Sequence, residues 1–427
     1  MTATSDHADL ARAVYAEQVQ RRTVGVLSAG QVLGGIAVAG SIPAGALLAA
    51  SIAGSDAAAG FAQTAGVLGA ALLALPLARL ALGKGRRSAL AVGYAIGAVG
   101  SGVVIAGAVL SSLVLVYAGC LLVGVASAAG YQARYAATDL ATPGTRARSL
   151  SWVVWAATVG AVVGPNLLNA SGLLGLRLGL PELAGPYVIT GAALLGAAAV
   201  LFVLLRPDPY LLAISHRVAS GGSVSRPRLR DGIDHLRTRP RAILGIVIIS
   251  IGHVVMVMVM VMTPVHMAHV DVTLQLIGLV ISVHIAGMYA FSPLVGWAVD
   301  RFGRIQMTVM SIGVLAISCL VCAFAPADNV VVLGIGLFLL GLGWSGTLIA
   351  GSTIVTDETD PVERPAVQGL SDLAMNAAGA LGGVAAGLIV WGSSYSVLCL
   401  VALVPLAALA AAVANPACRE HSNARSI

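Results

Sequence analysis

Methionine and histidine residues are concentrated in one stretch of this chain, and their side chains can act as ligands for soft metal ions. Six of the ten methionines lie between Met256 and Met288, and four of the eight histidines lie between His253 and His284. At helical spacing His253, Met256 and Met260 share one face, while His284 and Met288 lie one turn apart. Thioether sulfur is a soft, neutral ligand that suits Cu(I), and imidazole suits several transition metals. The pattern indicates a soft-metal site, with apolar packing by methionine or a pocket for organic molecules as the alternatives.

The composition shows which kind of element must carry these side chains. Hydrophobic residues make up 58% of the 427 residues, charged residues only 10%, and the mean hydropathy is +0.94. Soluble domains have about 25% charged residues, so the solvent for this chain must be a lipid bilayer. The 51 glycines suit the close helix contacts of a membrane bundle. The predicted fold is therefore an all-α membrane protein.

Apolar runs between polar breaks predict twelve membrane spans, enough to use most of the chain. The predicted spans are 23–53, 57–82, 89–109, 112–138, 149–172, 185–205, 241–268, 272–298, 306–326, 329–354, 366–391 and 395–414.

Positive charge is distributed very unevenly around these spans. All 24 Lys and Arg residues except Arg177 fall on one side of the predicted membrane. Because positive residues mark the cytoplasmic side, both termini are predicted to be cytoplasmic, in the inner (plasma) membrane of a bacterium. The net charge of +6 thus reflects topology and requires no nucleic-acid partner. The predicted organisation is an N-terminal segment at 1–22, a six-helix bundle at 23–205, a basic linker that touches lipid headgroups at 206–240, a second bundle at 241–414 and a cytoplasmic tail at 415–427.

The two halves repeat each other at a constant offset of 218 residues. The pattern T-D-x-x-x-P-x-x-R occurs at 138–146 and again at 356–364, and Gly85-Arg86 recurs as Gly303-Arg304. Two matches at one offset indicate a duplication. Parallel six-helix repeats are a transporter architecture, with the substrate site near the middle of the membrane.

One loop of the second half resembles a family signature. Residues 296–304 read G-W-A-V-D-R-F-G-R, which looks like the G-x-x-x-D-R-x-G-R motif of the major facilitator superfamily. The first-half copy is degraded, with Ala78, Leu82 and Gly83 at motif positions. The resemblance implies two pseudo-symmetric bundles, alternating access and a charge latch. Its residues here are Asp300, Arg301 and Arg304.

A second resemblance concerns the methionines. Met256-x-x-x-Met260 with His284-x-x-x-Met288 looks like the signature of the CcoA-like bacterial copper importers. The resemblance implies copper uptake through these four side chains, with copper as substrate and no cofactor. Toward the predicted outer side, Met258, Met262, His266 and Met267 form either a relay to this site or ordinary packing.

Other polar residues within the spans are candidates for coupling and gating. Asp372 lies inside a predicted span, where a carboxylate is costly and usually functional. Its expected partners are Arg134 or the pair Asn166 and Asn169, with a plain hydrogen-bond network as the alternative. Asp139 and Arg134 resemble an inner gate, with packing at a helix end as the alternative. Predicted cavity-lining residues are Gln31, Asn166, Gln368 and Asn376.

Three functions compete for this sequence. The first is copper uptake. The second is proton-coupled export of drugs or metabolites, or import of a small organic molecule such as riboflavin, which some relatives of the copper importers move. The third, an intramembrane enzyme or sensor, lacks any supporting motif such as H-E-x-x-H. The sequence therefore favours a non-enzymatic transporter, predicted to work as a monomer in the bilayer.

Overall fold

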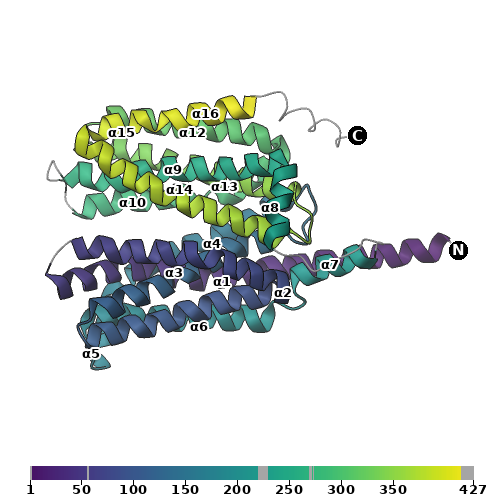
Figure 1. The fold of residues 1–427 in the computed structure, drawn as a ribbon, viewed down its shortest axis with the longest axis horizontal. Coiled ribbons are helices and arrows are strands. Elements are labelled where there is room, and N and C mark those ends of the chain that lie inside the picture. Colours follow the sequence, from purple (N-terminus) through teal and green to yellow (C-terminus); the bar gives the residue numbers. More distant parts are fainter. Residues whose placement is uncertain (1, 55–56, 220–228, 269–271, 273, 415–427) are drawn as a thin grey trace. The chain divides into compact units, whose positions relative to one another are not determined.

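The computed structural model describes residues 2–54, 57–219, 229–268, 272 and 274–414. Within these residues the chain forms α-helices and one short 3-10 helix, and contains no β-strand (Figure 1). The helical membrane fold predicted from composition is confirmed.

The helices follow one another with short connections. They are α1 (Thr2–Ala53), α2 (Ala57–Val109), α3 (Leu113–Ala136), α4 (Arg146–Asn166), α5 (Leu168–Arg177), η1 (Glu182–Ala184), α6 (Gly185–Leu204), α7 (Pro209–Ala219), α8 (Leu229–Thr238), α9 (Pro240–Ala268), α10 (Leu274–Tyr289), α11 (Ser292–Phe302), α12 (Arg304–Phe324), α13 (Val330–Asp357), α14 (Arg364–Gly392), α15 (Tyr395–Val401) and α16 (Leu403–Ala414). The amphipathic stretch expected around residues 229–236 is helix α8, and α1 continues through Pro43 without ending there.

Eleven helical segments of the described chain are long and apolar enough to cross a membrane. One of them, Phe61–Val109, has 49 residues and includes two of the spans predicted from the sequence. Gly85 interrupts it with φ 85° and ψ 170°, a conformation that suits glycine. The predicted loop between those two spans is thus a kink at one glycine, and the count of twelve spans stays a prediction.

The chain divides into two compact units. Unit 1 comprises residues 1–233 together with 360–372, and unit 2 comprises 234–359 and 373–427. The division passes through α14, whose first turns belong to unit 1 and whose remainder belongs to unit 2.

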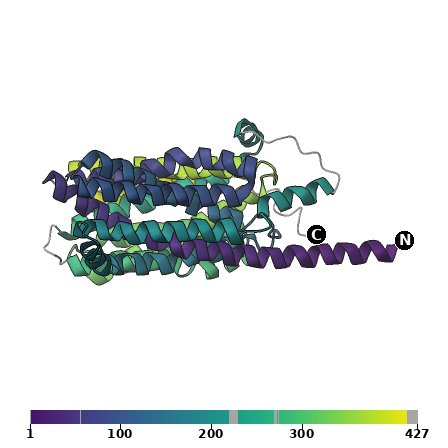
Figure 2. The ribbon, with the colours of Figure 1, turned by 90° about the horizontal axis from the view of Figure 1, so that it is seen from below.

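Inside unit 1, α2 packs against α3 and α6, and α1 packs against α4 and α6. Its core is built from small side chains and a few large ones, such as Leu27, Leu77 and the fully buried Tyr94. Figure 2 shows the N-terminal part of α1 extending beyond the other helices of this unit. Small residues allow such close helix approach where lipid supplies no driving force.

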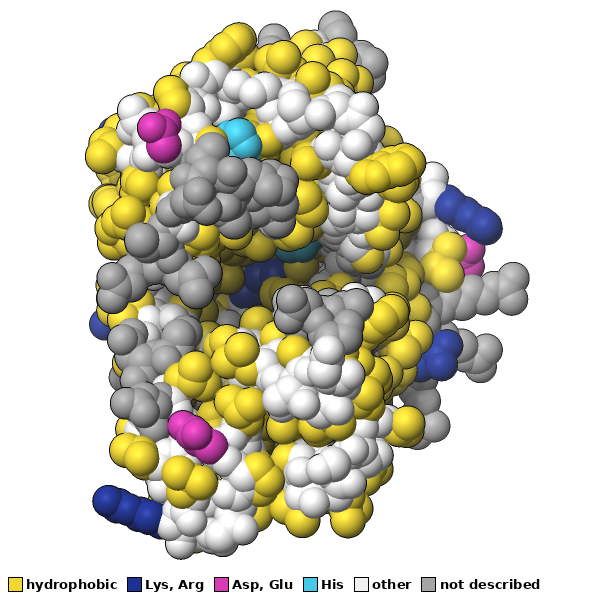
Figure 3. All heavy atoms as spheres, turned by 90° about the vertical axis from the view of Figure 1, so that its left-hand side faces the viewer, with side chains coloured by type: hydrophobic (Ala, Val, Ile, Leu, Met, Phe, Trp, Pro, Cys, Tyr) yellow, Lys and Arg dark blue, Asp and Glu magenta, His cyan; other side chains and the backbone are white. Residues whose placement is uncertain are grey.

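Inside unit 2, α13 is the central helix, because α9, α10 and α12 all pack against it. Its buried positions include a run from Trp344 to Thr356. Figure 3 shows the helix ends that point away from the two termini. Among the coloured atoms there, hydrophobic and uncharged side chains dominate and charged ones are scattered. The scarcity of charge on this face agrees with the uneven distribution of Lys and Arg in the sequence.

Candidate functional site

A cluster of buried charges lies at the kink of α2 in unit 1. Arg86 donates from Nε to Asp139 Oδ2 over 2.9 Å, and both side chains are almost completely buried. Its Nη2 also donates to Gln368 Oε1 at the beginning of α14. Arg364 donates to the backbone carbonyl of Asp139 over 3.3 Å. The predicted gate residue Asp139 is therefore paired with Arg86, which the sequence analysis identified only as the repeat partner of Arg304.

A second buried ion pair joins α3 to the first turns of α14. Arg134 Nη2 lies 2.6 Å from Asp372 Oδ1, and the two side chains are 3% and 1% exposed. The residues next to this pair in the chain also meet, because the hydroxyls of Tyr135 and Ser371 lie 3.0 Å apart. Of the partners expected for Asp372, the structure selects Arg134. The side chain of Asn166 lies outside the described residues, and so does that of Asn169.

The start of the linker is tied to the same cluster by Asp208. Its Oδ2 accepts from the backbone N–H of Arg87 over 2.8 Å, and its Oδ1 accepts from the N–H of Tyr210 at the start of α7 over 3.0 Å. A side chain on Gly85 would meet this carboxylate, so glycine is required there for space as well as for its positive φ. The hydroxyl of Tyr210 donates to the carbonyl of Val362 over 2.7 Å.

Unit 2 contains the repeated version of the first ion pair. Arg304 donates from Nε to Asp357 Oδ2 over 3.0 Å, the same atoms and the same separation of 53 residues as in Arg86 and Asp139. Arg304 also lies 3.7 Å from Asp300. The Arg304 and Asp357 side chains are 20% and 22% exposed, and Arg301 is exposed. The repeat predicted from two sequence matches thus places one ion pair in each unit, and only the first is sealed from solvent.

The predicted copper ligands lie on two helices, Met256 and Met260 on α9 and His284 and Met288 on α10. Met256 and Met288 are buried, and Met260 is half-buried. His284 is fully buried, with Nδ1 2.8 Å from the carbonyl oxygen of Leu337 on α13. Both α9 and α10 pack mainly on α13 and only slightly on each other. The described residues contain no cluster of three or more His, Cys, Asp or Glu placed to hold a metal ion. The prediction that Met256 and Met260 come together with His284 and Met288 at one site stays a prediction.

The predicted outer relay residues are mostly enclosed. Met258 and Met267 are buried, and Met262 is half-buried. His266 stacks on Tyr395 with ring centroids 4.3 Å apart and planes 16° apart. The choice between a relay and ordinary packing for this group stays a prediction.

Two of the residues predicted to line a cavity make hydrogen bonds to identified side chains. Gln31 accepts a hydrogen bond from Tyr94 over 2.9 Å, and Gln368 is buried against Arg86. Asn376 is 6% exposed on α14. Sequence reasoning missed Tyr94 and also Trp344, a tryptophan in the middle of a span, although tryptophan usually lies at membrane interfaces.

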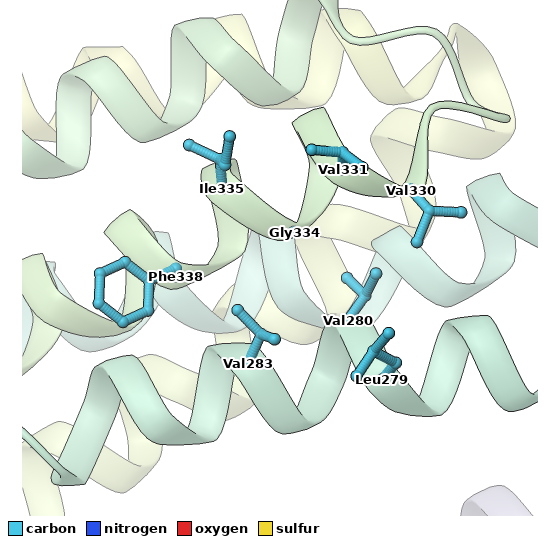
Figure 4. Close-up of a pocket in the computed structure, with 8 residues that line it drawn as sticks. All are labelled: Leu279, Val280, Val283, Val330, Val331, Gly334, Ile335 and Phe338. Atoms are coloured by element: carbon cyan, nitrogen blue, oxygen red, sulfur yellow. The ribbon is translucent and has the colours of Figure 1, made fainter.

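An apolar pocket of about 310 Å³ lies between α10 and α13. Figure 4 shows side chains of α10, among them Val280 and Val283, opposite those of α13, among them Ile335 and Phe338. All the described residues that line it are apolar.

Comparison with known proteins identifies the family. The sequence matches the Major Facilitator Superfamily over residues 27–273 and 247–425. The chain belongs to the major facilitator superfamily. It is 39% identical to the MFS-type transporter YdeG of Bacillus subtilis (strain 168), over 90% of this chain and 89% of that protein. It is 30% identical to the riboflavin transporter RfnT of Brucella anthropi, over 72% of this chain and 74% of RfnT.

Solved structures agree on the superfamily fold. A bacterial homologue of the iron transporter ferroportin in an outward-facing state aligns with a TM-score of 0.71 at 17% identity, covering 92% of this chain and 98% of that one. Such low identity shows the fold alone. The protein is therefore a multi-pass membrane transporter of this superfamily. Neither sequence relative is named for copper, so the resemblance to copper importers gains no support from these matches.

Proposed function

We propose that this chain is a proton-coupled secondary transporter of a small organic molecule, in which Arg134 and Asp372 form the coupling and gating pair. The observation that carries the proposal is the burial of this ion pair. Removing one charge of a buried pair leaves the other uncompensated, which destabilises the contact by about 3–5 kcal/mol. Protonation of Asp372 has the same consequence for Arg134. Proton binding therefore weakens the hold of α3 on the first turns of α14.

Alternating access requires that proton binding favour one conformation over another, and the link between protonation of Asp372 and its pairing with Arg134 meets this requirement. Asp372 stands at the boundary within α14 between the residues of unit 1 and those of unit 2. A ligand or proton shifts a conformational equilibrium only if it interacts differently with the two states. A proton that binds when the Arg134 pair is broken meets this condition. The cytoplasmic location of this gate follows from the distribution of Lys and Arg and is part of the proposal.

Support for an organic substrate comes from the riboflavin transporter RfnT, a relative whose name specifies an organic cargo.

The test uses purified protein in proteoliposomes with riboflavin as the probe. Wild type is expected to accumulate riboflavin when a proton gradient is imposed and to exchange labelled for unlabelled riboflavin without one. Asp372→Asn is expected to abolish gradient-driven accumulation while retaining exchange, because the carboxamide cannot take up and release a proton. Asp328→Asn, at an exposed carboxylate between α12 and α13, serves as the control. Full gradient-driven accumulation by Asp372→Asn would refute the coupling role.

Copper uptake is a second candidate, favoured by the setting of His284. With Nδ1–H donating to the Leu337 carbonyl, the lone pair of the ring lies on Nε2. That Nε2 is buried and has no hydrogen-bond partner among the described residues. Metal-binding histidines commonly donate their other N–H to a carbonyl in this way. Met288, one turn along α10, is also buried.

The copper candidate is tested by cellular copper content under copper limitation. Met288→Leu removes a sulfur at nearly constant volume, and Met375→Leu is the matched control at another buried methionine. Copper uptake requires that Met288→Leu and His284→Gln lower copper content while Met375→Leu does not. Equal copper in all four strains would eliminate this candidate and leave the organic substrate.

A further inference from the structure

The apolar pocket in unit 2 exists because α10 and α13 touch at one level and separate at another. A side chain at Gly341 would meet the backbone carbonyl of His284, and one at Gly287 would meet the backbone carbonyl of Phe338. The two helices are therefore in backbone contact at this level. Nearer the starts of both helices Gly334 is buried, yet a side chain there would meet no neighbouring atom within 4 Å. We call the open space beside Gly334 the α10–α13 groove (Figure 4).

The inner end of the groove is closed by an aromatic ring that a second ring holds in place. Phe338 packs edge-to-face on Phe291, with ring centroids 5.5 Å apart and planes at 88°. The other described side chains of the lining belong to Leu, Val and Ile residues. A water molecule in a cavity needs two to four polar partners, and these side chains supply none. The groove is therefore suited to an apolar occupant.

The groove opens away from the packed interior of unit 2. Trp344 of α13 points inward, since its indole donates to His253 of α9. Ile335 lies nine residues earlier, which is two and a half helical turns, so its side chain points to the opposite side of α13. Ile335, Val331 and Leu279 at the rim are 52%, 70% and 55% exposed. In a multi-pass membrane protein such apolar side chains contact lipid, so the groove is continuous with the protein–lipid interface.

The size of the groove matches one hydrocarbon chain. Its lining on α13 extends from Val330 to Phe338, which is about 12 Å along the helix axis. One leaflet supplies about 15 Å of hydrocarbon depth, half of the bilayer core. A volume of about 310 Å³ spread over about 12 Å gives a channel roughly 6 Å across. This width admits one unbranched chain, whereas an α-helix of a second protein copy is about 10–12 Å wide.

We infer that the α10–α13 groove is a binding site for one acyl chain of a membrane phospholipid. An empty apolar void leaves its lining without van der Waals partners, and an acyl chain supplies them. Val330 is the first residue of α13, so the mouth of the groove lies near the membrane surface, where the lipid headgroup stays in water. With the termini on the cytoplasmic side, as predicted, this is the outer leaflet. The inference does not depend on the cargo or on proton coupling.

The first experiment locates the lipid by photolabelling the full chain. The protein is placed in nanodiscs of phosphatidylglycerol that contain a small fraction of the same lipid with a diazirine on one acyl chain. After illumination, mass spectrometry of peptides compares residues 330–338 with residues 317–324 of α12. The second segment is a lipid-facing reference, because Ile317 and Phe324 are 54% and 76% exposed. Wild type is expected to carry at least threefold more label on residues 330–338, since a bound chain stays there longer.

Two matched variants connect the label to the groove. A leucine side chain at Gly334 fills the space, and Gly313→Leu on α12 is the control, because nothing lies within 4 Å of a side chain at either glycine. Both substitutions also raise helix propensity. Gly334→Leu is expected to lower the label on residues 330–338 at least threefold and to leave residues 317–324 unchanged. Gly313→Leu should keep the wild-type label on residues 330–338.

Thermal unfolding gives an independent measurement. In lipid-depleted detergent Gly334→Leu is expected to unfold about 2–4 °C above Gly313→Leu, because its side chain fills a void. Added phosphatidylglycerol should then raise the unfolding temperature of wild type and Gly313→Leu at least twice as much as that of Gly334→Leu. Gly334→Ala adds a single methyl group and is expected to give intermediate values, so the test stands even where the leucine variant folds poorly.

Three results would overturn the inference. The first is equal labelling of the two segments in wild type. The second is labelling of residues 330–338 that Gly334→Leu does not lower, or equal lipid responses of the two leucine variants. The third is a dimer in light scattering whose residues 330–338 carry no lipid label, which would assign the groove to a second copy of the chain.

Discussion

The two repeated ion pairs differ in burial, and this difference predicts unequal responses to the same substitution. Asp139→Asn and Asp357→Asn each remove one carboxylate charge at equivalent positions of the repeat. Arg86 is fully buried beside Asp139, whereas the side chains of Arg304 and Asp357 are about one-fifth exposed. Water can therefore take over the role of the lost carboxylate beside Arg304, but not beside Arg86.

The expected magnitudes follow from this environment. Breaking a buried pair by removing one partner costs about 3–5 kcal/mol. The amide oxygen of Asn and the remaining bond from Arg86 to Gln368 keep the Asp139→Asn value near ~3 kcal/mol. A partly exposed pair contributes about 0.2–1 kcal/mol. The two variants should therefore differ by roughly 2 kcal/mol in free energy of unfolding, with Asp139→Asn the less stable.

Equilibrium unfolding in mixed detergent–SDS micelles, followed by circular dichroism, measures this difference. The double variant Arg86→Leu with Asp139→Asn should be less destabilised than the sum of its single variants, because removing both charges leaves neither uncompensated. The reasoning is refuted if Asp357→Asn is as destabilising as Asp139→Asn, or if the double variant is fully additive.

Three other predictions concern the same region and the topology. Gly85→Ala should lower the free energy of unfolding by at least about 1–2 kcal/mol, because residue 85 has a positive φ and its side chain would meet Asp208. Gly83→Ala, with open space around it, should raise the free energy of unfolding by about 0.5–1 kcal/mol. The same unfolding assay measures both variants, and equal free energies of unfolding would contradict backbone strain at residue 85. Tyr210→Phe should cost about 1 kcal/mol through the lost bond to the Val362 carbonyl, and unchanged stability would exclude that bond as a contributor. Fusions of a fluorescent protein to either terminus should be fluorescent and alkaline phosphatase fusions inactive, as expected for cytoplasmic ends; active phosphatase at either end would reverse the predicted orientation.

The sequence by itself determined the class of the protein, the positions of most spans and the existence of a repeat. These properties depend on local composition and on residue types at fixed separations, which can be counted without a structure. The offset of 218 residues, read from two short matches, already aligned Arg86 with Arg304 and Asp139 with Asp357. The prediction of the cargo depends mainly on the Met and His run between residues 253 and 288, and local spacing is a weaker guide to a cargo than to a span or a repeat.

Only the tertiary structure decided which of these residues meet and how far they are sealed from water. Helical spacing placed His253 on a face with Met256, but its hydrogen-bond partner is Trp344, 91 residues away on another helix. Asp372 could be recognised as costly in a membrane, yet the choice of Arg134, 238 residues earlier, depends on how α3 packs against the start of α14. Pairing and burial are properties of long-range packing. The repeat therefore predicts two equivalent ion pairs, and the fold alone makes one of them buried and the other accessible.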